Sequence, residues 1–174
     1  MKTWTLHTAL LVVLMGTATL SGCRRPDPAV ELSPIVDRYV EIWNTGNLEG
    51  IEEILHPEFE LRMTPKFEPE IGIEAFKESI ARWRTAYPDF HIDLDEIFFA
   101  GDVGAVRWTI TATNSGPGWF PPTGKTVKVP GMSIFHFKQG KLKDEWIGGN
   151  NGYWLRQLGF ELVPPKPADP EPTG

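Results

Sequence analysis

Asn150 is the first residue of this sequence whose position favours chemistry. It lies in Gly-Gly-Asn-Asn-Gly, residues 148–152, between a predicted strand that ends at Ile147 and a predicted short helix from Tyr153 to Leu158. An amide cannot remove a proton from carbon, so Asn150 is no general base. It can donate a hydrogen bond to a carbonyl oxygen or a developing oxyanion. The alternative is a turn residue that caps the next helix.

Two ionisable side chains are further candidates for acid–base chemistry. His136 lies between two phenylalanines and is either a pocket base or a histidine satisfied within an interface. Asp144 and Glu145 are adjacent, so their side chains point to opposite faces of a strand and one of them can enter a pocket. Asp144 is the candidate because it shares the strand parity of Trp146 and Asn150. The alternative for Asp144 is a charged strand start beside lysines.

Composition excludes other classes of site. The net charge is −6, and the basic residues are scattered, which argues against a nucleic-acid surface. No histidines or carboxylates show metal-ligand spacing with a cysteine partner, and no glycine-rich loop could cradle a phosphate. We therefore predict no metal, no cofactor and no nucleic-acid partner. Seven Trp and ten Phe indicate a large aromatic core or an aromatic-lined pocket for a small hydrophobic molecule.

Residues 1–22 resemble the signal peptide of a bacterial lipoprotein. A short basic start precedes the apolar run Leu6–Leu20, and Leu-Ser-Gly-Cys ends at Cys23, the only cysteine. The resemblance implies cleavage before Cys23 and lipid on its sulfur. Arg24 then implies an outer-membrane anchor that faces the periplasm. The alternative is a retained membrane anchor, for which the strongly apolar part is short.

Hydrophobic periodicity divides the rest of the chain into helices followed by strands. Residues 23–33 form a predicted tether, 34–162 the domain, and 163–174 a proline-rich disordered tail. Ser33 and Pro34 are predicted to start the first helix, Asn47 to cap a short second one, and Ile73–Tyr87 to form a third. Period-two segments at 90–102, 103–116, 126–140 and 141–149 predict four strands. This order indicates an α+β domain with N-terminal helices packed on a bent antiparallel sheet.

Apolar residues fall on both parities of the predicted strands, as at Ile134 and Phe135. Bulges that shift the register would explain this pattern, and so would an outer sheet face that is buried in a homodimer. We expect some of each.

The order of several short motifs resembles the SnoaL-like polyketide cyclases of the nuclear-transport-factor-2-like superfamily. These motifs are Pro88-Asp89-Phe90, Pro122-Thr123-Gly124-Lys125, a Gly-Lys-Leu…Glu-Trp hairpin and Gln157-Leu158-Gly159. The resemblance runs from about Pro34 to Phe160 and implies a cone-shaped fold. It does not specify an activity, because this fold carries enzymes of several kinds and proteins without catalysis.

The resemblance also bears on the site. In the cyclases, a carboxylate four residues after the last-strand tryptophan is the acid/base for an intramolecular aldol closure, and Asn150 holds that position here. Asn114 stands where the family often has histidine. We expect the two amides to line a pocket walled by Trp43, Trp108 and Trp146, with Tyr39 and Phe59. Two functions follow: an enzyme that acts on a small hydrophobic carbonyl compound, or a non-catalytic small-molecule-binding protein.

Overall fold

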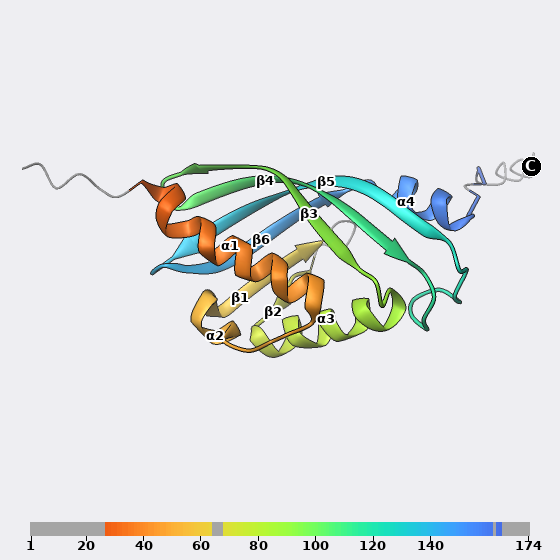
Figure 1. Cartoon of the computed structure of the whole chain (residues 1–174), viewed down its shortest axis with the longest axis horizontal. Helices are drawn as coiled ribbons and strands as arrows, with labels where there is room; N and C mark the ends of the chain where they lie inside the picture. The colour runs from red at the N-terminus through yellow and green to blue at the C-terminus, as the bar shows by residue number, and fades with distance from the viewer. Residues whose placement is uncertain (1–26, 64–67, 162, 165–174) are drawn as a thin grey trace, which may run out of the picture.

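The computed structural model describes residues 27–63, 68–161 and 163–164. Its helices are α1 (Pro28–Thr45), α2 (Ile51–Ile54), α3 (Ile73–Ala86) and α4 (Asn151–Leu158), and its strands are β1 (Leu55–Met63), β2 (Glu70–Ile71), β3 (His91–Ala100), β4 (Val103–Thr113), β5 (Thr126–Lys138) and β6 (Lys141–Gly149). The strands form one sheet in the order β2-β1-β6-β5-β4-β3, curved around α1 and α3 (Figure 1). The predicted α+β fold, with helices packed on a bent sheet, is confirmed.

The four long strands form the predicted meander. Strands β3 to β6 pair antiparallel in chain order, whereas β1 lies parallel to β6. The hairpin turns fall where turn residues predict them. Gly101 and Gly140 have positive φ, which glycine adopts at little cost, and Gln139 also has positive φ. Both turns lie at one end of the sheet, so the β4–β5 connection and α4 lie at the other end (Figure 1).

Helix α1 starts earlier than predicted. The Asp27 side chain accepts a hydrogen bond from the backbone N–H of Ala29, and Pro28 occupies the first turn, where a missing N–H costs nothing. Pro34 lies inside the helix instead of at its start. Residues 28–33 are therefore helical and do not belong to a tether. The predicted signal peptide, Cys23 and most of the predicted tail lie outside the described residues.

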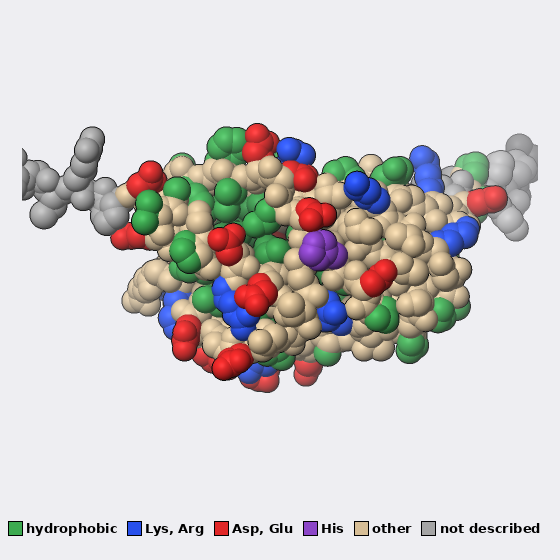
Figure 2. Space-filling model, in the orientation of Figure 1, with side chains coloured by type: hydrophobic (Ala, Val, Ile, Leu, Met, Phe, Trp, Pro, Cys, Tyr) green, Lys and Arg blue, Asp and Glu red, His purple; other side chains and the backbone are tan. Residues whose placement is uncertain are grey.

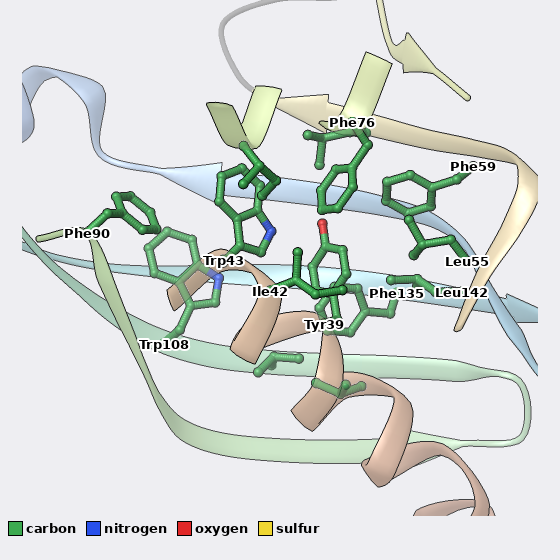
Figure 3. Packing of buried hydrophobic residues seen from close by; sticks show 14 of the residues in the cluster. Tyr39, Ile42, Trp43, Leu55, Phe59, Phe76, Phe90, Trp108, Phe135 and Leu142 are labelled. Atoms are coloured by element: carbon green, nitrogen blue, oxygen red, sulfur yellow. The ribbon is translucent and has the colours of Figure 1, made fainter. Parts of the chain in front are cut away.

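Aromatic side chains fill the space between the helices and the sheet. The ring of Tyr39 on α1 stacks on Phe76 of α3 with centroids 5.3 Å apart and meets Phe135 of β5 edge-on at 5.8 Å. Figure 3 shows the indoles of Trp43 and Trp108 beside this group. Such contacts fix the position of α1 relative to the sheet.

Two strand bulges set which side chains face the core. The β3–β4 register shifts between Leu94 and Glu96. The β5–β6 register shifts between His136, which pairs with Asp144, and Phe137, which pairs with Leu142. Lys143 is the extra residue on β6. The predicted bulges are thus present, and they explain part of the apolar mixing on both parities.

The outer face of the sheet is uncovered by any described element and carries apolar side chains. Its most exposed members are Phe98 (62% exposed), Met132 (64%), Ile134 (48%) and Trp146 (52%). Among the described helices, none combines the length and hydropathy needed to cross a bilayer.

Candidate functional site

A cavity of about 530 Å³ lies between α1, α3, α4 and the inner face of the sheet. Its volume falls within the range of small-molecule sites. Aromatic side chains dominate its wall: Tyr39, Trp43, Trp83, Tyr87, Phe90, Trp108, Trp119, Phe120, Phe135 and Trp154. Val40, Met63, Ile92, Leu94, Ile110, Val129, Ile147, Gly149, Leu155, Asn150 and Asn151 add to it.

Among the described residues that line the cavity, Glu145 is the only one with an acidic or basic side chain. No lysine, arginine or histidine of the described residues joins it there. Its side chain is 4% exposed, so the carboxyl lies in an environment that strongly disfavours charge. A buried carboxyl with no cationic side chain among the described lining residues costs stability, and such groups cluster at functional sites.

Two short hydrogen-bond chains hold the Glu145 carboxyl. The Tyr39 hydroxyl donates to Glu145 Oε2 at 2.5 Å, and the Trp43 indole donates to the Tyr39 oxygen. On the other side, Trp108 Nε1 donates to Ser133 Oγ at 2.9 Å, and the Ser133 hydroxyl donates to the carboxyl. Helix α1 and strands β4 and β5 therefore all contribute residues that orient the Glu145 carboxyl of β6.

Burial raises the pKa of Glu145 from 4.5 to about 7, and the hydrogen bonds from Tyr39 and Ser133 offset part of this rise. Burial, with the nearby Glu145 charge, also raises the pKa of Tyr39, so that its hydroxyl keeps its proton and remains a donor. Near neutral pH, Glu145 therefore exists in both protonation states. This is the property of a group that takes a proton and returns it.

A glycine allows Trp108 to lie across the sheet inside the cavity. A Cβ at Gly131, the β5 partner of Trp108, would lie 2.0 Å from the indole Cη2. Any side chain at this position would displace the ring, and the ring carries the donor to Ser133. Gly131 is thus a site residue that the motifs did not reveal.

Asn150 lines the cavity and also caps α4. Its side-chain oxygen accepts from the Tyr153 backbone N–H at 2.9 Å, which is the capping alternative raised by the sequence. The residue is exposed, so it marks the mouth of the cavity. Asn150 lies five positions after Glu145, or roughly 16 Å away along an extended strand. The two groups therefore cannot act on the same atom of a small ligand.

Asn114 lies outside the cavity lining and organises the β4–β5 connection. It is 1% exposed, its side-chain oxygen accepts from the Thr123 N–H at 2.9 Å, and its backbone oxygen accepts from the Gly124 N–H at 2.9 Å. The convergence of Asn114 with Asn150 in one pocket is not found. Asn114 follows the inward parity of β4 but comes after the strand ends at Thr113, where the chain turns away.

His136 and Asp144 lie together on the outer face of the sheet, away from the cavity. His136 Nδ1 is 2.7 Å from Asp144 Oδ1 across the β5–β6 pair. Trp146 shares this face, half exposed, with the Arg62 guanidinium 4.9 Å from its ring centroid. The expectation that Asp144 and Trp146 face the pocket is wrong, because the opposite parity of β6 faces inward.

Three of the five predicted wall residues line the cavity: Tyr39, Trp43 and Trp108. Phe59 is fully buried but lies behind Tyr39, whose ring it meets edge-on at 6.0 Å. It belongs to the core and does not line the cavity.

Glu145 is the functional candidate that the sequence reasoning passed over in favour of Asp144. The inward orientation of Glu145 could have been inferred from the strand that pairs with β6. Ser133 and Phe135 share a parity on β5, and Glu145 is the partner of Phe135. Partners across a ladder point to the same face, so an inward Phe135 requires an inward Glu145. Within the described residues, His, Cys, Asp and Glu side chains form no group of three that could hold a metal ion.

Comparison with known proteins places this chain in a family. A family model described as SnoaL-like polyketide cyclase matches residues 33–158. No protein with a curated description matches the chain at a significant level.

Solved structures agree with the family model. TsrD from Streptomyces laurentii is 26% identical, with 75% of this chain and 96% of that chain covered and a TM-score of 0.67. A candidate polyketide cyclase from Acidithiobacillus ferrooxidans is also 26% identical, with 74% and 94% covered and a TM-score of 0.66. A candidate SnoaL-like polyketide cyclase from Jannaschia sp. CCS1 shares the fold, at 19% identity, 82% and 99% coverage and a TM-score of 0.70. Because the family model matches residues 33–158, most of the chain, and solved structures share the fold, this chain belongs to the SnoaL-like polyketide cyclase family.

Proposed function

We propose that this protein catalyses proton transfer at a carbon next to a carbonyl group in a small hydrophobic compound. The observation that carries the proposal is the single carboxyl of Glu145, held by Tyr39 and Ser133 inside an otherwise apolar cavity. Its pKa of about 7 suits both removal and return of a proton at neutral pH.

In this mechanism the ionised Glu145 removes the proton from carbon, and the bond electrons move onto the carbonyl oxygen. In an aldol closure, the enolate carbon then attacks a second carbonyl carbon of the same molecule. The alkoxide that forms takes the proton back from Glu145, so the carboxylate is restored. In an isomerisation, the proton returns to a different carbon. The aromatic walls bind the flat apolar part of the compound and exclude water from the carboxyl.

The substrate is uncharged where it enters the cavity. No cationic side chain among the lining residues could pair with a carboxylate or a phosphate there, and Glu145 would repel either. The test is deuterium exchange: neutral bicyclic and tricyclic diketones, incubated with protein in D₂O, should gain deuterium next to the carbonyl by NMR. Matched compounds that carry a ring carboxylate should exchange at the background rate.

A non-catalytic binding protein is the second candidate function. It is supported by Asn150, an amide where the resemblance implies the acid/base carboxylate, and by its use as a helix cap. This role predicts saturable binding of the diketones with no exchange above background.

We further propose that the protein is exported, carries a lipid on Cys23, and lies at the outer membrane facing the periplasm. Because acylation requires the thiol, Cys23→Ser should abolish palmitate labelling and release the protein from the membrane fraction. Thr17→Ser is the matched control within the same segment and should label as wild type. Labelling and membrane fractionation that persist in Cys23→Ser would refute the anchor.

A homodimer through the outer sheet face is the proposed assembly. Met132, Ile134 and Trp146 form a contiguous exposed apolar surface there, because Ile134 pairs with Trp146 in the ladder. Light scattering should give twice the monomer mass, and Ile134→Lys should give the monomer. Val30→Lys places the same charge at an exposed apolar position on α1 and should leave the dimer intact. A wild-type monomer at high concentration would contradict the assembly.

A further inference from the structure

Exposed aromatic side chains lie at the end of the cavity where its lining residues Trp119 and Asn150 are themselves exposed. Trp119 of the β4–β5 connection is 49% exposed, Tyr153 of α4 is 46% exposed, and Phe160 after α4 is 36% exposed. We call these three residues the aromatic rim. Large aromatic side chains placed in water at one end of a protein mark an interaction surface.

The rim is continuous with the cavity wall. Trp119 lines the cavity, and its ring meets Trp83 of the wall with centroids 4.8 Å apart. Phe160 packs on Phe120 of the wall, also at 4.8 Å. On α4, Trp154 lines the cavity while its neighbour Tyr153 points to solvent. The rim therefore adjoins the exposed part of the cavity wall.

Basic side chains accompany the rim. Lys125, Lys128 and Arg156 are exposed, and none of them forms an ion pair with a carboxylate of the described residues. The neighbouring exposed acids are Asp89, which binds the Thr113 backbone N–H, and Glu161. In Figure 2, Lys and Arg side chains gather at the α4 end of the molecule, whereas Asp and Glu predominate at the end where α1 begins. This polarity stands out in a chain with a net charge of −6.

We infer that the aromatic rim and these three basic residues dock the mouth of the cavity on an anionic lipid surface. Tryptophan and tyrosine favour the boundary between headgroups and acyl chains, and lysine and arginine favour anionic headgroups. An uncharged compound that suits the apolar cavity also partitions into a bilayer. Docking lets that compound pass between bilayer and cavity without crossing water. The inference holds for an enzyme and for a binding protein alike.

Spin labels on the full-length chain test the docking and distinguish it from insertion of other segments. In a Cys23→Ser background made by cell-free synthesis, one label is attached at Tyr153→Cys and another at Ala100→Cys, an exposed position at the opposite end of the sheet. Vesicles contain phosphatidylglycerol and phosphatidylcholine in a one-to-three ratio, and collision rates with oxygen and with a water-soluble nickel chelate are measured. The label at 153 should gain oxygen collisions and lose nickel collisions, while the label at 100 should change in neither.

Charge reversal at the two ends of β5 supplies a matched pair. Lys128→Glu lies beside the rim and should weaken vesicle binding, read from the label at 153, by about tenfold at low salt. Lys138→Glu, at the far end of the same strand, should leave it as in the parent. The inference is overturned if the label at 153 does not respond to vesicles, if the label at 100 responds equally, or if the two reversals have the same effect.

Discussion

Glu145→Gln is expected to lower the rate of α-carbon deuterium exchange by about 10²–10⁴-fold at pH 7. The amide keeps the shape of the side chain and can still accept the hydrogen bond from Tyr39, but it cannot take up a proton. Binding of the diketones, measured by quenching of the cavity tryptophans, should therefore change little. The combination of retained binding and lost exchange identifies an acid/base group.

Asp144→Asn is the matched control, because the same change is made one residue earlier, on the outer face of the sheet. It should exchange within about twofold of wild type, as expected for a surface substitution. Equal activity of Glu145→Gln and wild type would exclude Glu145 as the base. If neither protein exchanges but both bind, the binding-protein candidate is the correct one.

The free energy of unfolding should fall by about 3 kcal/mol between pH 4.5 and pH 7 through Glu145 alone. The unfolded chain ionises this carboxyl near pH 4.5, but the native protein ionises it only near pH 7. Between these values the native state binds more protons than the unfolded state, so rising pH favours unfolding. Above pH 7 both states are ionised, and the loss is complete.

The measurement is the difference in unfolding free energy between Glu145→Gln and wild type, from urea titrations at pH 5 and pH 8. The variant lacks the titrating group, so its unfolding free energy minus that of wild type should be higher at pH 8 than at pH 5 by about 3 kcal/mol. Asp89 does not interfere: its pKa is lowered from 3.8 because hydrogen bonds with Thr113 outweigh its burial, so this carboxyl is ionised in both the folded and the unfolded state at pH 5 and at pH 8. Glu161→Gln is the control at an exposed position. If the difference in unfolding free energy between Glu145→Gln and wild type is the same at pH 5 and pH 8, the pKa of Glu145 is not raised in the folded protein.

Local patterns were sufficient wherever a single element specifies itself. The apolar spacing from Ile73 onwards predicted α3, Pro88 predicted its end, and the change to period two predicted the four long strands. The start of α1 was missed because Ser33 and Pro34 imitate a helix start, whereas the true cap, Asp27, lies in a segment whose composition favours a linker.

The site was harder to predict because the orientation of β6 is not a local property. Hydrophobicity favours an inward Trp146 and an outward Glu145, and the structure has the reverse. The stability that an inward tryptophan would contribute is forgone, and a carboxyl is buried instead. Conflicts of this kind between local preference and tertiary placement concentrate at functional sites.

Local sequence patterns are enough to predict the order of the helices and the long strands, the resemblance to the family, and the abundance of aromatic rings for a cavity. Which ionisable group enters that cavity follows instead from how the whole sheet packs. The inward face of β6 is set by its pairing with β5, where Phe135 lies opposite Glu145, and by the extra residue Lys143, which lets both Leu142 and Glu145 face the core. Alternation alone cannot say which of two faces meets α1, because a strand has the same period whichever side it buries.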